Sequence, residues 1–348
     1  MKKILAAVFA LLILFAVYTA WKFFGPATYF EGKTKFLYIP SRNATKEHVL
    51  ELLQQDSMVH SPFFFAWIAD RMGYWKKIKP GKYKIGSGNS VFTTVRLLRN
   101  GTQTPVNLVI TKLRTREDLA SLAGRRLECD SAALIRFLNN PDSLKPYGLD
   151  TNTVMTAVFP NTYTYFWNTT PGKVFGKFLR QYNAYWTEER TGLAKAKGLT
   201  PQTAYILASI VEEETNKNTD KGNITSVYLN RLNKGMKLGA DPTVKFALRD
   251  FGLRRIYYKH LAVESPYNTY KVAGLPPGPI CTPTTTTLDA VLHAPQTDYL
   301  YFVAKSDFSG YHVFANTYPE HMKYAKEYQD SLNRYLQRRL PAKDNLSQ

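Results

Sequence analysis

The sequence predicts an α+β protein in which a membrane-spanning helix precedes two globular parts. Residues 4–21 form an uncharged and strongly apolar run close to the N-terminus. Short alternating strands and short amphipathic helices follow this run, whereas longer helical patterns dominate after about Thr156. A chain of 348 residues, at roughly 150 residues per domain, is long enough for about two domains with sizeable cores.

The composition is that of a globular protein with an excess of basic residues. Hydrophobic residues make up 44%, aromatic residues 14% and charged residues 21% of the chain, which excludes a disordered, collagen-like or coiled-coil protein. Cys129 and Cys281 are too few for a disulfide scaffold or a zinc array; they either pair in an oxidising compartment or remain buried thiols. The formal net charge of +19 indicates an anionic partner: nucleic acid, anionic lipid or another polyanion.

The apolar run at residues 4–21 predicts a single-pass membrane anchor. At ~1.5 Å per residue it spans about 27 Å, close to the thickness of the hydrocarbon core. Lys2 and Lys3 precede it, so we expect the N-terminus in the cytoplasm and the chain after Lys22 on the other side of the inner (cytoplasmic) membrane. A cleaved signal peptide is the alternative, although bulky Trp21 follows a poorly matched cleavage site.

This topology removes nucleic acid from the expected partners. The basic residues are scattered, with no zinc-finger spacing and no long block of Lys and Arg. The positive charge is therefore expected to suit anionic lipid and an anionic extracytoplasmic polymer such as the cell wall.

The first globular part is predicted to run strand, helix, helix, strand, helix. The strands show alternating hydrophobicity, and the first one stops at Pro40. The helices show apolar residues at helical spacing, with Thr45 as one N-cap and Ser90 or Asn89 as another. The predicted elements up to residue 150 are strands at 35–40, 82–85 and 106–110 and helices at 45–53, 63–72, 91–98, 116–123 and 131–138.

Longer helices are predicted in the second part. Thr200 and Pro201 suit the N-cap and the first turn of a helix. The other predicted elements are a loop or turn at 159–163, a long helix at 171–191, a helix at 228–232, a Gly/Pro-rich loop at 265–283, a strand at 299–304 and an amphipathic helix at 319–340.

Three consecutive acids end the helix that starts after Thr200. At 100° per residue, Glu214 lies on the apolar face with Ile210 and Val211, whereas Glu212 lies on the opposite, more polar face. A carboxyl group against apolar neighbours has a raised pKa and can hold a proton near neutral pH, as the general acid of glycosidic cleavage requires. Periodicity alone leaves an alternative open, in which Glu214 is a solvated residue at a frayed helix end.

The motif that contains these acids resembles one in a known family. ASIVEEET at 208–215 resembles the ASIVEKET motif of the endolytic murein transglycosylases, the MltG or YceG-like family, and KPGKY at 79–83 resembles a strand start in the family's LysM-like subdomain. The resemblance covers about residues 35–340. Further motifs follow in the family's order: VYLNRL at 227–232, GMKL at 235–238, DPTV at 241–244, SPYNTY at 265–270, GLPPGPI at 274–280, YLYFVA at 299–304, and then His312, Phe314 and His321.

The resemblance implies a membrane-anchored enzyme that cuts peptidoglycan glycan strands internally. It implies that Glu214 is catalytic, that products end in 1,6-anhydro-N-acetylmuramic acid, and that no cofactor or metal is needed. It also implies a role in terminating nascent strands beside penicillin-binding proteins. The expected organisation is a cytoplasmic stub and anchor at 1–25, a LysM-like module and connecting segment at 33–150, a mainly helical α+β transglycosylase domain at 155–340 and a polar tail at 341–348.

Other residues are candidates for substrate binding, and each has a structural alternative. Asp241 either orients substrate or caps the helix that begins at Pro242, and the sequence favours the cap. Asn230 and Arg231 either bind sugar or peptide groups or bond loop carbonyls. Glu213, at a position where the family commonly has Lys, is expected to raise the pKa of neighbouring acids. The candidate substrate-binding residues are Asn230, Arg231, Asp241, Thr243, Tyr267, Asn268 and Thr269, and Glu212 and His312 are expected to support them from behind.

Two other functions remain open on the sequence. One is a non-catalytic cell-wall protein that binds glycan through the LysM-like module. The other is a hydrolytic muramidase, which would need a second carboxylate besides Glu214.

Overall fold

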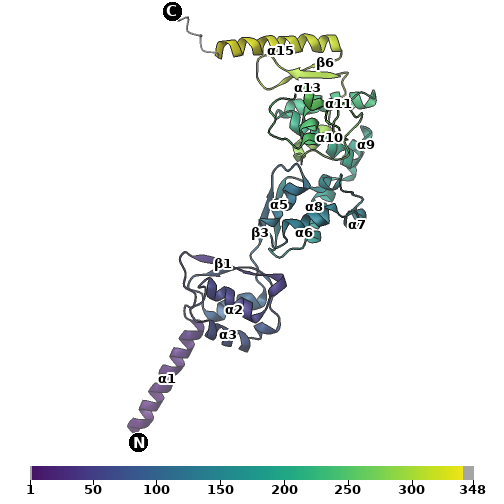
Figure 1. Cartoon of the computed structure of the whole chain (residues 1–348). Helices are drawn as coiled ribbons and strands as arrows, with labels where there is room; N and C mark the ends of the chain where they lie inside the picture. The colour runs from purple at the N-terminus through teal and green to yellow at the C-terminus, as the bar shows by residue number, and fades with distance from the viewer. Residues whose placement is uncertain (1, 340–348) are drawn as a thin grey trace, which may run out of the picture. The chain divides into compact units, whose positions relative to one another are not determined.

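The structure is a computed structural model that describes residues 2–339, and the predicted polar tail at 341–348 lies outside them. The chain forms two compact units (Figure 1). Unit 1 contains the residues up to 108 together with 121–134 and 163–174. Unit 2 contains 109–120, 135–162 and the residues from 175 onward. Each unit is therefore assembled from segments that are separate in the sequence.

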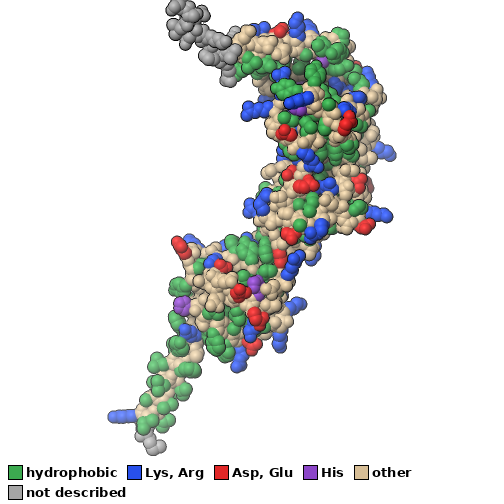
Figure 2. Space-filling model, in the orientation of Figure 1, with side chains coloured by type: hydrophobic (Ala, Val, Ile, Leu, Met, Phe, Trp, Pro, Cys, Tyr) green, Lys and Arg blue, Asp and Glu red, His purple; other side chains and the backbone are tan. Residues whose placement is uncertain are grey.

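The first element of unit 1 is the long helix α1 (Lys2–Phe24). Within the described residues it is the one helix long and apolar enough to cross a membrane, with a mean hydropathy of 2.5. Hydrophobic side chains cover its surface in Figure 2, because no other element packs around most of its length. The predicted apolar helix is thus present in the structure.

The rest of unit 1 follows the predicted order of strand, helix, helix, strand, helix. Strand β1 (Thr34–Ile39) pairs antiparallel with β2 (Gly81–Gly86), with Leu37 opposite Tyr83. The strands alternate, so Leu37, Ile39 and Tyr83 are buried. Side-chain oxygens of Thr45, Ser61 and Ser90 cap the three helices that cover these residues. The helices are α2 (Lys46–Gln55), α3 (Pro62–Arg71) and α4 (Val91–Asn100).

The predicted loop at 159–163 is wrong, because Asn161–Tyr165 is strand β4. It pairs with β3 (Val106–Ile110), and Tyr163 and Tyr165 alternate into buried positions. Pro160 suggested a turn, and the strand partner lies too far away in the sequence for local patterns to reveal it. The other elements before residue 160 are the 3₁₀ turns at 41–43, 74–76, 145–147 and 154–157 and the helices α5 (Arg116–Gly124), α6 (Ser131–Asn139) and α7 (Pro141–Leu144).

The predicted single helix at 171–191 is also wrong, because two helices occupy this region. Helix α8 (Pro171–Tyr185) ends before Thr187, and the Thr187 hydroxyl accepts the Arg190 N–H as the N-cap of α9 (Glu188–Ala196). Thr187 therefore begins a second helix, although the amphipathic pattern continues across the boundary between the two helices.

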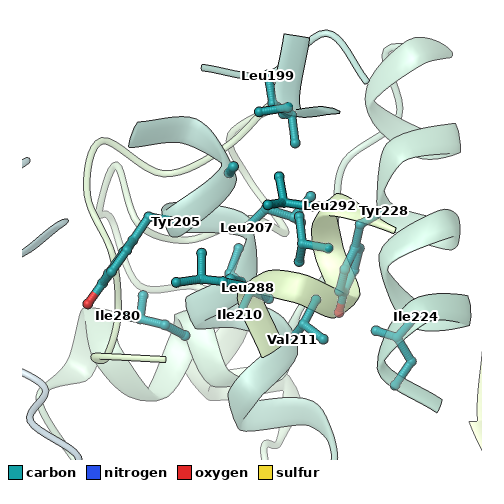
Figure 3. Packing of buried hydrophobic residues seen from close by; sticks show 14 of the residues in the cluster. Leu199, Tyr205, Leu207, Ile210, Val211, Ile224, Tyr228, Ile280, Leu288 and Leu292 are labelled. Carbon is teal, nitrogen blue, oxygen red and sulfur yellow. The ribbon is translucent and has the colours of Figure 1, made fainter. Parts of the chain in front are cut away.

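The remaining elements surround helix α10 (Pro201–Glu214). The residues from Ala204 to Glu212 are all buried. Figure 3 shows Leu207, Ile210 and Val211 close to Leu288 and Leu292. The neighbouring elements are α11 (Asn218–Asn233), which begins ten positions before the predicted 228–232 helix, α12 (Asp241–Leu248), α13 (Tyr258–Leu261), α14 (Thr285–Leu292), the β5 (Tyr301–Ala304) and β6 (His312–Ala315) hairpin, and α15 (Tyr318–Arg339).

The predicted α+β class with an N-terminal apolar helix is confirmed. The LysM-like assignment of the first module stays a prediction. Cys129 is a partly buried free thiol and Cys281 is a buried one. The two cysteines therefore do not form a disulfide with each other in the structure.

Candidate active site

Helix α10 holds the three acids in fixed positions because its N-terminal end and its middle are bonded. Thr200 and Thr203 form a reciprocal capping box at its N-terminus. The Ser209 hydroxyl donates to Ile206 O and accepts the Ile280 N–H at 3.0 Å, which ties the Gly/Pro-rich loop to the helix. The helix ends at Glu214, so this side chain projects from a rigid support.

Glu214 is partly buried at the end of α10 and is bonded to a buried tyrosine. The Tyr228 hydroxyl donates to Glu214 Oε1 at 2.6 Å, and Tyr228 is 1% exposed. Burial raises the pKa of Glu214 to about 7, and the nearby negative charge of Asp241 also raises it. The Tyr228 hydrogen bond and the positive charges of Arg231 and Lys245 act in the opposite direction. Glu214 is therefore not a solvated residue at a frayed end.

Asp241 is the second acid of this site, and its predicted capping role is wrong. Ala240 is the N-cap of α12, and Asp241 is the first helical residue. The Asp241 side chain instead accepts the Tyr270 hydroxyl at 2.6 Å on Oδ1. Burial, together with this bond to Asp241, raises the pKa of Tyr270. Two tyrosine–carboxylate pairs, Tyr228–Glu214 and Tyr270–Asp241, thus lie close enough for their charges to interact.

Glu213 has the opposite environment to Glu214. Its carboxylate contacts Lys112 Nζ at 3.1 Å and Arg114 Nη2 at 3.2 Å. Burial alone would raise the pKa of Glu213, but these two cations hold it below its ordinary value. The expectation that Glu213 raises the pKa of its neighbour does not fit this pairing, because the acid that acts on Glu214 is Asp241.

Glu212 lies in a polar network inside unit 2, and not on an exposed polar face. Its Oε2 accepts from Lys221 Nζ at 3.4 Å, from Thr284 Oγ1 at 3.1 Å and from the Thr287 hydroxyl. Lys221 Nζ also donates to Thr287 Oγ1 at 2.7 Å. A buried charge needs such partners. Glu212 therefore connects α10 with α11 and α14 behind the site.

Asn230 and Arg231 bond loop carbonyls. Asn230 Nδ2 donates to Thr297 O at 2.7 Å and to Tyr299 O at 2.9 Å. Arg231 Nε donates to Leu300 O at 2.7 Å, and its Nη1 donates to Leu238 O at 2.6 Å. These bonds correspond to the structural alternative for both residues, although the Arg231 charge still acts on Glu214.

The predicted residues of the SPYNTY segment mostly shape their own loop. Asn268 is fully buried, and its Nδ2 donates to Leu261 O and Val263 O, both at 2.9 Å. Thr269 Oγ1 accepts the Ala240 N–H and lies 2.8 Å from Thr243 Oγ1, which is also buried. The Tyr267 ring packs against Phe246 with a centroid distance of 4.6 Å. This arrangement positions the neighbouring Tyr270 on Asp241.

His312 supports the hairpin beside the site. Its backbone N–H and Nδ1 lie 2.8 and 3.0 Å from Oδ2 of Asp220, a buried residue in the first turn of α11. The His312 ring contacts Phe302, which in turn packs edge-on against Tyr228.

Within residues 2–339 no group of three or more His, Cys, Asp or Glu side chains is placed to hold a metal ion.

Sequence reasoning missed the two tyrosines and Asp220. Tyr228 follows Glu214 by 14 positions and lies on a different helix, so periodicity could not pair them. The available signal was chemical: a tyrosine inside an otherwise apolar helix face needs a partner for its hydroxyl.

Residues 37–327 match the model of the YceG-like family. The chain belongs to the YceG-like family. The resemblance recognised in the sequence is thereby confirmed, and the match includes all three acids of α10 and both tyrosines.

The YceG-like chain is similar to curated proteins named endolytic murein transglycosylase. It is 39% identical to the one from Bacillus subtilis over 177 residues, which cover 51% of the chain and 48% of that relative. It is 30% identical to one from Streptococcus pneumoniae over 178 residues, which cover 50% of the chain and 32% of that relative. The chain thus spans half or less of the length of the curated relatives it matches.

A solved structure supports the same fold. The YceG-like chain is similar to the 2.6 Å crystal structure of a YceG-like protein from Listeria monocytogenes, with a TM-score of 0.56 and 26% sequence identity. The similarity covers 84% of this chain and 98% of the other one.

Proposed function

We propose that this YceG-like chain is an endolytic peptidoglycan lytic transglycosylase with Glu214 as its catalytic acid and base. The observation that carries the proposal is the state of Glu214: a partly buried carboxyl whose pKa is raised by burial to about 7, at the end of a rigid helix. Such a group can both give and take a proton near neutral pH. The relatives named endolytic murein transglycosylase support the choice of substrate and reaction.

In the first step, protonated Glu214 donates to the oxygen that links N-acetylmuramic acid to N-acetylglucosamine. Because Tyr228 donates to Oε1, the transferable proton belongs on Oε2. The bond between muramoyl C1 and this oxygen breaks, and C1 gains oxocarbenium character. The Tyr228 hydrogen bond stabilises the carboxylate that remains.

In the second step, the same carboxylate takes the proton from the C6 hydroxyl of the muramoyl residue. The C6 oxygen attacks C1 and closes the 1,6-anhydro ring, and Glu214 returns to its protonated form. A single carboxyl group suffices because the nucleophile belongs to the substrate. A hydrolase needs a second carboxylate to activate water or to form a covalent intermediate.

A hydrolytic muramidase is the second candidate, because Asp241 places another carboxylate within electrostatic range of Glu214. Against it stands the Tyr270 hydroxyl, which already occupies Oδ1 of Asp241. In the reaction we propose, Asp241 raises the proton affinity of Glu214 and does not touch water.

The experiment is digestion of purified glycan strands by the full chain in detergent micelles, read by mass spectrometry. Wild type is expected to release 1,6-anhydro ends, and Glu214→Gln is expected to be slower by about two to four orders of magnitude. Glu213→Gln is the matched control, because it removes the adjacent acid, and it should keep the anhydro product. Reducing ends from wild type would identify a hydrolase, and binding without cleavage would identify a glycan-binding protein. An active Glu214→Gln variant would reject the assignment.

The proposed location follows from α1. We place the N-terminus in the cytoplasm, α1 across the inner membrane, a LysM-like module within 33–150 and the catalytic domain within 155–340 on the extracytoplasmic side. An enzyme held at this membrane meets glycan strands as they are made. We therefore assign it the termination of nascent strands, with penicillin-binding proteins as its expected neighbours.

A further inference from the structure

Helix α3 has an aromatic face that the core of unit 1 does not explain. Its inner residues, Phe65, Ile68 and Ala69, are buried. On its other face Phe63 is 82% exposed and Trp67 is 41% exposed. The outer face of a surface helix is normally polar, so large exposed aromatic side chains indicate a surface that contacts something else.

This face lies against the end of α1. The Phe23 ring packs edge-on against Phe64 at 5.5 Å and against Trp67 at 5.6 Å. Phe24, which is 68% exposed, contacts Phe92 of α4 at 5.6 Å. We call the six residues Phe23, Phe24, Phe63, Phe64, Trp67 and Phe92 the aromatic collar. The collar lies at the C-terminal end of α1, where this helix contacts α3 and α4.

The chain between α1 and the rest of unit 1 is held in place. The Ala27 and Thr28 N–H groups donate to Asn89 O at 2.9 and 3.1 Å, and the His60 N–H donates to Ala27 O at 2.9 Å. The collar therefore keeps a fixed position relative to the end of α1.

That position corresponds to the membrane surface. If residues 4–21 span the hydrocarbon core, Lys22 to Phe24 lie at the boundary between acyl chains and headgroups. Residues whose rings contact Phe23 lie at the same depth. Tryptophan and other amphipathic aromatic side chains concentrate at this boundary.

Basic side chains accompany the collar. The Arg71 guanidinium lies 5.2 Å from the Trp67 ring centre, and that of Arg96 lies 5.7 Å from the Phe92 ring centre. Lys22 follows on α1, and Asp70 is the acidic residue of α3. Three cations against one carboxylate suit the phosphates of lipid headgroups. A hollow between α1 and α3, lined by Tyr18, Phe23, Phe63 and Trp67 among others, has the apolar lining that an acyl chain needs.

We propose that the aromatic collar is a second membrane contact of this chain, in which α3 lies in the interface of a phospholipid bilayer with Phe63 and Trp67 inserted among the headgroups. The proposal rests on the proposed membrane anchoring by α1. It makes the membrane-facing side of unit 1 part of the anchor, in the manner of an interfacial amphipathic helix.

The test is spin-label accessibility of the full chain in nanodiscs that contain phosphatidylglycerol. In a Cys129→Ser, Cys281→Ser background, single cysteines replace Phe63, Leu12 in α1, or Phe36, which is an exposed aromatic residue of β1 (37% exposed). Oxygen concentrates in lipid, whereas a nickel chelate stays in water. The Phe63→Cys label is expected to have an oxygen-to-nickel accessibility ratio several-fold above that of Phe36→Cys, and Leu12→Cys is expected to have the highest ratio.

The three positions separate the proposal from its premise. If the label at position 12 is in lipid but the label at position 63 is as accessible to water as the one at position 36, the collar contact is overturned and the anchor stands. A water-accessible Leu12 label overturns the anchoring and the collar contact together.

Discussion

At the scale of single residues, three adjacent acids of one helix have three different environments. Glu212 is buried and paired with Lys221, Glu213 is paired with Lys112 and Arg114, and Glu214 is bonded to a neutral tyrosine. The third arrangement leaves a carboxyl group that holds its proton near neutral pH. The difference comes from the neighbours and not from the residue type, which is the same in all three cases.

The pH dependence of activity tests the neighbours of Glu214 individually. The general acid must be protonated, so kcat/KM of wild type should fall as pH rises above about 7. Tyr228→Phe removes a bond that favours the carboxylate, so this alkaline limb should move to higher pH. Asp241→Asn removes a negative charge that favours the protonated form, so the limb should move to lower pH. Shifts of both variants in one direction would contradict the assigned roles.

The pKa of Glu214 also predicts an effect on stability. Since burial raises it from 4.5 to about 7, the folded state binds the proton more tightly than the unfolded state. Ionisation of Glu214 therefore lowers the free energy of unfolding as pH rises through this window. Glu214→Gln removes the effect. Its free energy of unfolding should therefore exceed that of wild type by roughly 1–3 kcal/mol at neutral pH, whereas the two proteins should be equally stable at pH about 4. Chemical denaturation followed by circular dichroism at both pH values measures the difference.

Residue-level prediction from sequence succeeded where helical geometry sufficed and failed where a partner came from another segment. The 3.6-residue period placed Glu214 and Glu212 on different faces, and in the structure the two side chains have different partners. It could not indicate that α14 covers the face that carries Glu212. It also could not indicate that the Asp241 side chain accepts the Tyr270 hydroxyl and does not cap its helix. Both facts depend on residues 29 to 75 positions away.

At the scale of elements, α10 is stabilised by its bonds to α11 and α14 as well as by apolar packing. The network of Glu212, Lys221, Thr284 and Thr287 joins all three helices. In a buried network the loss of one partner leaves the other charge without compensation.

Lys221→Met is therefore expected to lower the free energy of unfolding by about 3–5 kcal/mol, because it leaves the Glu212 carboxylate buried and unpaired. The double variant Glu212→Gln, Lys221→Met should recover more than half of this loss. Urea denaturation of the two single variants and the double variant provides the double-mutant cycle. A double variant as unstable as the sum of the single variants would show that the two residues do not interact.

Elements with strong local signals were predictable, and those that depend on pairing were not. The caps at Thr45, Ser90 and Thr200 lie where the sequence placed them. Strand β4 and strand β6 were missed because each is short and needs its partner to be recognised. The boundary between α8 and α9 was missed because both helices continue one amphipathic pattern.

At the scale of the whole molecule, the net charge favours an anionic partner, as the proposed cell-wall substrate would be. The net charge of +19 is spread over the chain and not concentrated in one block. Such a distribution raises the local concentration of an anionic polymer without selecting a sequence or a site.

Binding to insoluble peptidoglycan should therefore depend on salt. Raising the salt from about 0.05 M to about 0.5 M shortens the Debye length from roughly 14 Å to roughly 4 Å, so the bound fraction in a sedimentation assay should fall several-fold. Glu214→Gln, which we expect to cut the polymer far more slowly than wild type, keeps the substrate largely intact during the measurement. If the bound fraction does not change with salt, the net positive charge does not contribute to peptidoglycan binding.

The bonded connection between α1 and the rest of unit 1 has a mechanical consequence. Ala27 and Thr28 are already fixed to Asn89, so an anchored enzyme would have no slack between its bilayer span and its first module. A membrane protein attached in this way reaches its substrate by lateral diffusion in the plane of the bilayer. Tension on a bound glycan strand would be transmitted directly to α1. Its reach would be limited to glycan within one molecular length of the bilayer.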